Sequence, residues 1–254
     1  MKYSHVFITR PRRESEELSA LLTPLGLQCV IQPAFTYAPL AAAALQKELF
    51  AELSKVGSDA LLIFTSPRAV AHGLSQLPDG LLFQARVTAI GPATAKALET
   101  AGIRVDVRPR EGYTSEALLE TLDDDSFLKP SGRSRSFIIA APGGRRKLFE
   151  GLESRGWKPG VVMVYESEPA KLDKSGLKSL QEATGVLCVW TSANAMKALS
   201  QRLPPAAWFR LCQGEWLVIS ERLKRLARAY GPARIHLSQG PGNADLLSSI
   251  RRLV

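Results

Sequence analysis

The 254-residue sequence lacks the features that mark several large classes of protein. It has only three cysteines, Cys29, Cys188 and Cys212, and they lack the CxxC spacing of zinc or redox sites. No run approaches the roughly 18 consecutive apolar residues of a membrane span, and no apolar stretch of signal-peptide length stands near Met1. We therefore expect a cytoplasmic protein with buried thiols rather than a disulfide scaffold or a membrane protein.

Common catalytic motifs are missing as well. The three histidines, His5, His72 and His236, are scattered and form no HExxH or other metal-ligand spacing. The sequence has no GxSxG nucleophile elbow and no Cys–His nucleophile signature. An enzyme with this sequence would work mainly by holding a reactive substrate in one geometry.

Positive charge is in excess, because 33 lysines and arginines stand against 24 aspartates and glutamates, a formal net charge of +9. Such a surface attracts nucleic acid, anionic lipid or a polyanionic small molecule. The cations are spread over several short clusters, and ordinary solvated helix faces account for part of them. Nucleic-acid binding is the weakest interpretation, since no recognised motif and no aromatic–basic interleaving accompany the charge.

Most of the sequence occurs twice, in the same order. FTSPRAV (Phe64–Val70) returns as WTSANAM (Trp190–Met196), and EGYTSEALLETL (Glu111–Leu122) returns as QGPGNADLLSSI (Gln239–Ile250). The spacing of about 130 residues is far above the periods of solenoid repeats. We therefore expect two copies of one fold and a cleft between two domains, with paired loops facing it.

Short apolar runs alternate with amphipathic segments in both copies. In the first copy, strands are expected at 5–10, 28–33, 59–66, 86–91 and 103–109, and helices at 14–26, 67–77, 92–102 and 114–122. Apolar strands separated by helices favour parallel sheets covered on both faces. Five such units in each copy indicate a flavodoxin-like doubly wound sheet, in which ligands bind beyond the carboxyl ends of the strands.

The first candidate junction is Thr65-Ser66, which recurs as Thr191-Ser192. Hydroxylated residues at a helix start cap the exposed N–H groups, and the same groups bind carboxylate or phosphate well. Capping alone would explain one such junction. The recurrence in both copies favours ligand contact.

The second junction is Gly91-Pro92-Ala93-Thr94, where a helix starts without side-chain bulk. It is neither GxGxxG nor a P-loop, so a dinucleotide or nucleoside triphosphate is a weak interpretation. Its counterpart in the second copy is Ser220-Glu221, and the carboxylate of Glu221 would repel an anion. Either that half binds an anion less tightly, or the two copies have specialised.

Two further features follow strands in the second copy. Gly143-Gly144-Arg145 leads into two more cations, which favours either an anion cradle or a glycine turn before a basic, solvated helix. Tyr165 stands at a strand end, where a tyrosine either packs with its hydroxyl at the surface or donates a hydrogen bond or a proton.

The ordered set ITRP, LIFTSPRAV, VTAIGPATAKALETAGI, EGYTSEALLETL, the Gly-Gly-Arg junction and VMVYES resembles the uroporphyrinogen-III synthase family over nearly the whole chain. The resemblance implies two flavodoxin-like α/β domains with doubly wound parallel sheets, joined by two linker strands and separated by a cleft. In that family the first strand–helix–strand segment completes the domain formed mainly by the C-terminal segment. The expected domains are therefore 1–36 plus 171–254, and 40–166, with linkers near 35–40 and 165–172.

The resemblance also implies a lyase of haem biosynthesis (EC 4.2.1.75) that cyclises hydroxymethylbilane to uroporphyrinogen III. Water is lost, ring D is inverted, and neither a metal nor an organic cofactor is used. The substrate carries eight carboxylates, which suits basic, hydroxylated junctions.

Residue roles are implied in the same way. Tyr165 assists departure of the hydroxyl group. Substrate-binding residues on one wall of the cleft are Thr65, Ser66, Gly91, Pro92, Ala93 and Thr94, with Gly143, Gly144 and Arg145 on the same domain; the opposite wall carries Thr191, Ser192 and Ser220. The Ser220-Glu221 pair departs from the Gly-Pro form of the first copy.

A competing hypothesis is a non-catalytic, two-lobed binding protein for an anionic small molecule, which fits two similar lobes and a cleft equally well. The expected partner in either case is a small molecule, not nucleic acid or a membrane. For the enzyme we expect a monomer that makes transient contact with the enzyme that forms hydroxymethylbilane.

Overall fold

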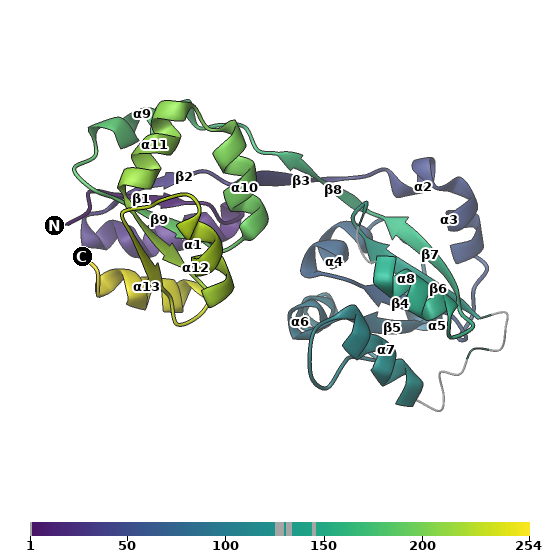
Figure 1. The fold of residues 1–254 in the computed structure, drawn as a ribbon. Coiled ribbons are helices and arrows are strands. Elements are labelled where there is room, and N and C mark those ends of the chain that lie inside the picture. Colours follow the sequence, from purple (N-terminus) through teal and green to yellow (C-terminus); the bar gives the residue numbers. More distant parts are fainter. Residues whose placement is uncertain (1, 125–129, 131–133, 144–145) are drawn as a thin grey trace. The chain divides into compact units, whose positions relative to one another are not determined.

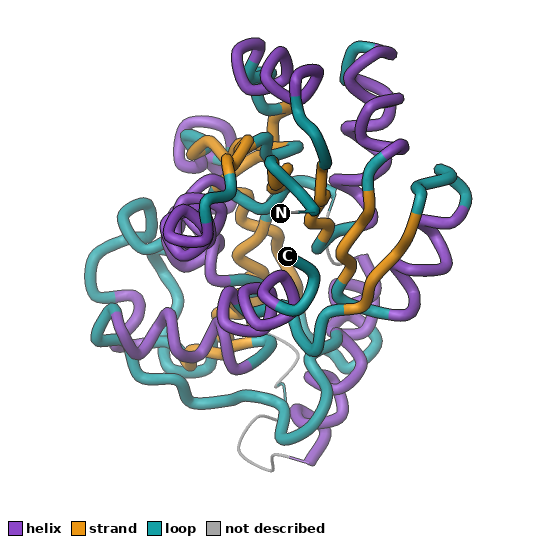
Figure 2. The backbone as a smooth tube through the Cα atoms, turned by 90° about the vertical axis from the view of Figure 1, so that its left-hand side faces the viewer, coloured by secondary structure: helices purple, strands orange, loops and turns teal. Residues whose placement is uncertain are grey.

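The computed structural model describes residues 2–124, 130, 134–143 and 146–254, and the chain forms two compact units (Figure 1). Unit 1 combines the two ends of the chain, Met1–Thr36 and Glu168–Val254, whereas unit 2 is the continuous segment Tyr37–Ser167. Figure 2 colours the strands orange and the helices purple, and both marked chain ends belong to unit 1. Each unit is a parallel sheet with helices packed on both faces.

The sheet of unit 1 has five parallel strands in the order β11-β10-β9-β1-β2. Their bounds are β1 (His5–Ile8), β2 (Gln28–Ile31), β9 (Val186–Trp190), β10 (Glu215–Val218) and β11 (Arg234–Leu237). In the centre, Val6 is paired with Cys29 of β2 and with Leu187 of β9. Every residue of β1 and β9 is buried, which explains their continuous apolar sequences.

Alternate residues of these strands point to opposite faces, and each face has its own helical layer. Val6 and Ile8 pack with α1 and α13, whereas Phe7 packs with α9 to α12. The helices of unit 1 are α1 (Arg12–Leu22), α9 (Lys174–Glu182), α10 (Ala193–Arg202), α11 (Pro205–Gln213), α12 (Glu221–Arg228) and α13 (Asn243–Arg251), with the 3₁₀ turn η1 (Thr23–Leu25) after α1.

The sheet of unit 2 has the strand order β5-β4-β6-β7, all parallel. The strands are β4 (Leu61–Phe64), β5 (Arg86–Ala89), β6 (Arg135–Ala140) and β7 (Lys158–Met163). Phe64 packs in a core with α4 and α6, and Ile63 packs on the other face with α7 and α8. The helices are α2 (Ala42–Leu45), α3 (Lys47–Leu53), α4 (Pro67–Gly73), α5 (Leu81–Gln84), α6 (Pro92–Thr100), α7 (Ser115–Asp124) and α8 (Arg146–Glu153).

The strand expected at 103–109 is reduced to a single bridge between Val107 and Thr88. The side chain of Asp106 explains this difference, because its Oδ2 accepts the N–H of Val87 at 2.8 Å. A carboxylate thus takes the place that a main-chain carbonyl would have in a regular ladder. The corresponding segment of unit 1, β11, is a complete strand.

Each unit combines strands from both sequence copies. Counted from β1, the sheet of unit 1 has the flavodoxin-like order 2-1-3-4-5. The sheet of unit 2 has the same order when counting starts at β6 and β7 and continues with β4, β5 and the Val107 bridge as the fifth strand. The predicted α/β fold with doubly wound parallel sheets is confirmed. The chain passes from one unit to the other along β3 (Phe35–Pro39) and β8 (Tyr165–Pro169), and these two strands pair with each other.

Glu215, the first residue of β10, links three other side chains of unit 1. Its carboxylate accepts a hydrogen bond from Tyr3 (2.6 Å), forms an ion pair with Lys2 (2.7 Å) and is hydrogen-bonded to Nε2 of His236 (2.5 Å). Burial by itself raises the pKa of Glu215, but the hydrogen bonds from Lys2, Tyr3 and His236 outweigh burial and lower that pKa to about 2. The carboxylate therefore stays ionised far into the acid range.

The three cysteines are free thiols. Burial raises the pKa of the Cys188 thiol well above its ordinary value, so this group stays protonated at neutral pH. Within the described residues, no helix is long and apolar enough to cross a membrane.

Candidate active site

Apart from Tyr165, which begins β8, the residues predicted for the site stand where strands end and helices begin. Thr191, Ser192 and Ser220 belong to unit 1, and the other predicted residues that the structure describes belong to unit 2. In a doubly wound sheet these junctions lie at the carboxyl edge of the strands, where ligands bind.

Tyr165 and Ser66 meet in unit 2. Tyr165 begins β8 and is buried, with 8% of its surface exposed. Its Oη lies 3.2 Å from the Oγ of Ser66, and either hydroxyl can be the donor. Ser66 also caps α4, because its Oγ accepts the N–H of Ala69 at 3.0 Å. The hydroxyl of Ser66 thus ties the phenol to the start of a helix.

The ring of Tyr165 is held on two sides. His72, from the last turn of α4, stacks on it with ring centroids 5.5 Å apart and 25° between the planes. Tyr37, from β3, meets it edge-on at 6.0 Å and 66°. With the ring fixed in this way, the direction of its hydroxyl is fixed as well.

The main chain before Tyr165 is also fixed. The carbonyl of Val164 accepts hydrogen bonds from the side-chain amide of Gln76 (2.9 Å) and from the N–H of Leu40 (3.0 Å). The amide oxygen of Gln76 accepts the N–H of Ala42 at 3.1 Å. These bonds hold the start of β8 against the segment that follows β3, independently of the contacts of the Tyr165 ring.

Thr65, the other half of the Thr-Ser junction, is turned toward the sheet. Its hydroxyl donates to the carbonyl of Ile139 on β6 at 2.9 Å, and the residue is buried. In unit 1 a similar bond comes from Thr9, which follows β1 and donates to the carbonyl of Val189 on β9 at 2.8 Å. The first hydroxyl after the strand therefore braces neighbouring strands in both units.

The junction at Gly91 has a different construction. α6 starts at Pro92 with no side-chain cap, Ala93 is exposed and Thr94 is buried. A Cβ on Gly91 would lie only 3.2 Å from the Cβ of Tyr113, so glycine permits the loop after Val107 to approach the start of α6. Tyr113 itself is 62% exposed.

The glycine-rich junction after β6 is described in part. Gly143 has φ +72°, in the left-handed region that glycine tolerates. Gly144 and Arg145 lie outside the described residues. The cations that follow are paired, Arg146 with Glu150 at 2.7 Å and Lys147 with Glu116 at 3.1 Å.

In unit 1 the predicted serines cap helices. Ser192 Oγ accepts the N–H of Ala195 at 3.3 Å, and Ser220 Oγ accepts the N–H of Leu223 at 3.2 Å. Thr191, at the end of β9, is half-buried. Glu221 stands in the first turn of α12, where the helix dipole favours a carboxylate, and it pairs with Lys224 at 3.6 Å.

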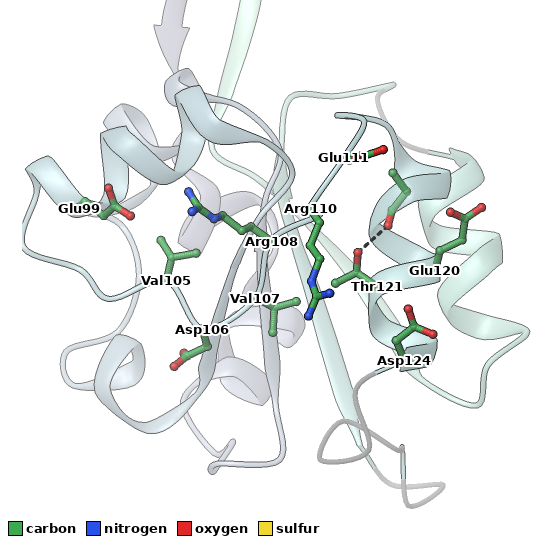
Figure 3. Close-up of a pocket in the computed structure, with 11 residues that line it drawn as sticks. Glu99, Val105, Asp106, Val107, Arg108, Arg110, Glu111, Glu120, Thr121 and Asp124 are labelled. Carbon is green, nitrogen blue, oxygen red and sulfur yellow. Dashed lines mark hydrogen bonds between the residues drawn. The ribbon is translucent and has the colours of Figure 1, made fainter.

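A pocket of about 970 Å³ lies beside the Val107 segment of unit 2 (Figure 3). It is lined by two arginines, Arg108 and Arg110, and by five acidic residues: Glu99, Asp106, Glu111, Glu120 and Asp124. In Figure 3 the side chains of the two arginines point in different directions. Because acids outnumber cations, this pocket suits a polycarboxylate poorly, and none of the predicted site residues lines it.

A smaller pocket of about 420 Å³ shares the same two arginines. Pro92, Pro109 and Tyr113 complete its lining, and no acidic side chain contributes to it. Pro92 is one of the predicted substrate-binding residues, so this pocket adjoins the Gly91 junction.

The sequence did not predict three residues near Tyr165. Tyr37 and His72 contact its ring, and Arg68 contacts the ring of Tyr37. No local pattern marks them, because their contacts join segments far apart in the chain. Among the described residues, no group of three or more histidine, cysteine or acidic side chains could hold a metal ion.

Comparisons with known proteins agree with one another. A family model described as uroporphyrinogen-III synthase HemD matches residues 16–248. Two similar proteins are both named uroporphyrinogen-III synthase. The one from Escherichia coli is 28% identical over 253 residues, and the one from Salmonella typhimurium is 30% identical over 256 residues; each alignment covers 97% of this chain and 99% of the relative.

Solved structures share the fold. A mutant uroporphyrinogen III synthase from Thermus thermophilus aligns with a TM-score of 0.61 at 21% identity, over 98% of both chains. The synthetase from Helicobacter pylori aligns with a TM-score of 0.62 at 18% identity, over 98% of this chain and 99% of the other. At these identities the structural likeness speaks for the fold alone.

Proposed function

The chain belongs to the uroporphyrinogen-III synthase family and is thereby a lyase of haem biosynthesis, and we propose that Tyr165 and Ser66 start its cyclisation of hydroxymethylbilane. The single observation that carries this assignment is the 3.2 Å hydrogen bond between the hydroxyls of Tyr165 and Ser66. The ring that bears the Tyr165 hydroxyl is fixed by its contacts with His72 and Tyr37. A phenol fixed in this way is suited to deliver a proton to a leaving group.

In the proposed reaction, the C–O bond of the hydroxymethyl group breaks, and the departing hydroxyl takes the proton of Tyr165 and leaves as water. The electron pair of the pyrrole nitrogen supports the resulting azafulvenium cation. The substituted carbon of ring D then attacks this cation and gives a spiro intermediate, whose rearrangement inverts ring D. A proton is released when the macrocycle closes, so the phenol is restored and the net loss is one water.

Most of the barrier is lowered by conformational control, because the azafulvenium cation forms readily and the isomer depends on which carbon of ring D attacks. Holding reacting atoms in a near-attack geometry can supply several kcal/mol, about 7 to 11 in well-oriented model reactions. We therefore assign the remaining predicted residues to binding. Ser66 orients the phenol, and the Gly91–Thr94 and Gly143–Arg145 junctions receive carboxylates.

Thr191, Ser192 and Ser220 keep the binding role that the family resemblance gives them, as carboxylate ligands of unit 1. Each serine caps a helix through a single accepted bond, so its hydroxyl proton stays available to a carboxylate. The non-catalytic binding protein, the alternative raised by the sequence, has no observation that favours it over the enzyme.

The deciding experiment uses hydroxymethylbilane generated in situ by the enzyme that makes it. The products are oxidised to porphyrins, and the type I and type III isomers are separated by chromatography. The protein should direct product to the type III isomer, whereas a reaction without it gives type I by spontaneous closure. A reaction that yields only type I with active, folded protein would refute the function.

We also propose that the enzyme is a cytoplasmic monomer and that it receives its unstable substrate during transient contact with the preceding enzyme. Support comes from the family resemblance and from the short lifetime of hydroxymethylbilane in water. Light scattering after size exclusion should give a mass near 27.7 kDa. A stable dimer would contradict the monomer without affecting the reaction.

A further inference from the structure

The guanidinium of Arg68, in the first turn of α4, lies over an aromatic ring. Its Cζ is 4.0 Å from the centroid of Tyr37, well within cation–π distance. A cation–π contact does not use the N–H donors of the guanidinium in hydrogen bonds to other polar groups. The side chain is thus positioned by Tyr37 without using its hydrogen-bonding groups.

Those donors have no partner in the described part of the chain. No hydrogen bond and no ion pair of the Arg68 side chain is found there. Four other arginines of unit 2 do pair with carboxylates: Arg104, Arg135, Arg146 and Arg155. Arg68 is also only half-exposed, so part of its water shell is already removed. A guanidinium that lies over a ring, partly desolvated and unpaired, is ready to bind an anion.

Arg68 stands next to the proposed chemistry. The Tyr37 ring that carries it also touches the Tyr165 ring, with centroids 6.0 Å apart. Along the chain, only Pro67 separates it from Ser66, whose hydroxyl contacts Tyr165. An anion bound by Arg68 would therefore lie close to the phenol.

We infer that Arg68 is a carboxylate-binding residue for the tetrapyrrole, placed by Tyr37 so that a substrate side chain is anchored beside Tyr165. The inference rests on the proposed function, which supplies a substrate with carboxylates on every ring. The planar fork of Arg68 matches a carboxylate bidentately, and the anchored substrate presents its hydroxymethyl oxygen to the phenol.

The test compares Arg68→Gln and Arg68→Met, which both keep an unbranched stem that can lie on Tyr37, with Arg68→Lys. Each variant is assayed for KM, kcat and isomer with hydroxymethylbilane generated in situ. Loss of one charge-assisted contact should raise KM about tenfold in the first two variants, while kcat stays within about threefold. Arg68→Lys should be intermediate, because lysine keeps the charge but lacks the fork.

Arg86→Gln is the matched control. Arg86 is also half-exposed and belongs to the same unit, but it begins β5 and therefore lies at the amino edge of the sheet, opposite the proposed site. Its KM should equal that of the wild type. The wild-type KM should also rise with ionic strength more steeply than that of Arg68→Gln, a difference that lost packing would not produce.

The possible outcomes distinguish failure of the proposed role of Arg68 from failure of the proposed synthase activity. Type III product with an unchanged KM in Arg68→Gln or Arg68→Met overturns the role of Arg68 and leaves the synthase intact. A fall in kcat with unchanged KM also overturns it, because ground-state anchoring predicts the opposite. A wild-type reaction that yields only the type I isomer overturns the proposed function and this inference together.

Discussion

Replacing Tyr165 by phenylalanine removes one oxygen atom and leaves the ring in place. The stack on His72 and the edge contact with Tyr37 involve the ring alone, so both persist in the variant. The lost hydrogen bond to Ser66 is neutral and fairly long at 3.2 Å. Its removal should therefore lower the free energy of unfolding by only about 0.5 to 1 kcal/mol.

The expected effect on catalysis is much larger. Positioned proton transfer contributes about 10²- to 10⁴-fold to rate, so Tyr165→Phe should lower kcat at least about 100-fold, or about 2.7 kcal/mol of barrier. KM should stay within about twofold, because the carboxylate ligands are untouched. The measurement is the initial rate of type III formation, with thermal unfolding recorded for the same preparations.

Ser66→Ala completes a double-mutant cycle. This single change removes the cap of α4, at a cost of about 1 kcal/mol in stability, and leaves the Tyr165 hydroxyl without its partner. If Ser66 acts in catalysis only by orienting that hydroxyl, the double variant should have the kcat of Tyr165→Phe alone. A Tyr165→Phe enzyme with wild-type kcat would remove Tyr165 from the catalytic step, and additive kcat effects in the cycle would give Ser66 a role of its own.

Three further outcomes are expected. His72→Ala should lower kcat while His72→Phe, which keeps a stacked ring on Tyr165, restores most of it; equal loss in both would rule out positioning by the stack. Glu215→Gln should destabilise unit 1 at pH 7 by about 1 to 2 kcal/mol in urea unfolding followed by tryptophan fluorescence, because solvent screens the pairing with the exposed Lys2. Because the folded pKa of Glu215 is lowered to about 2, this contribution is complete above about pH 4.5 and is lost as pH falls toward 2, so the two proteins should converge there. The exposed pair of Glu150 serves as the control, since Glu150→Gln should change stability by less than about 0.5 kcal/mol. Ser192→Ala should cost about 1 kcal/mol through loss of its cap, and a change below about 0.3 kcal/mol would contradict the capping geometry.

The fold class could be predicted from the order of apolar and amphipathic segments, because burial in a covered sheet requires apolar residues at these positions. Strands such as β1 and β9 are covered on both faces, so their sequences are continuously apolar and recognisable. The segment at 103–109 alternates apolar and charged residues, a pattern that also favours a strand, but it forms only a single bridge. There a single side chain, Asp106, takes over a main-chain hydrogen bond, and a pattern of apolar residues does not register such an exchange.

The junctions of the candidate site were predictable as positions, since parallel strands direct their carboxyl ends to one edge. The side-chain contacts at these junctions could be predicted only in part. The capping roles of Ser66, Ser192 and Ser220 agree with local sequence, whereas the stack of His72 and the edge contact of Tyr37 depend on how α4 and β3 pack against β8. The roles assigned to these residues in binding and catalysis stay predictions.

The composition of unit 1 from both chain ends has a consequence for synthesis on the ribosome. β1, α1 and β2 are made first, but β9, the neighbour of β1, follows about 150 residues later. At roughly 5 to 20 residues per second the delay is on the order of 8 to 30 s. During that time the apolar flank of β1 has no strand to pair with, whereas unit 2 is continuous and can fold as soon as it emerges. Unit 2, in the middle of the chain, can therefore complete its fold during synthesis, whereas unit 1 can complete its fold only after the C-terminal segment has been made.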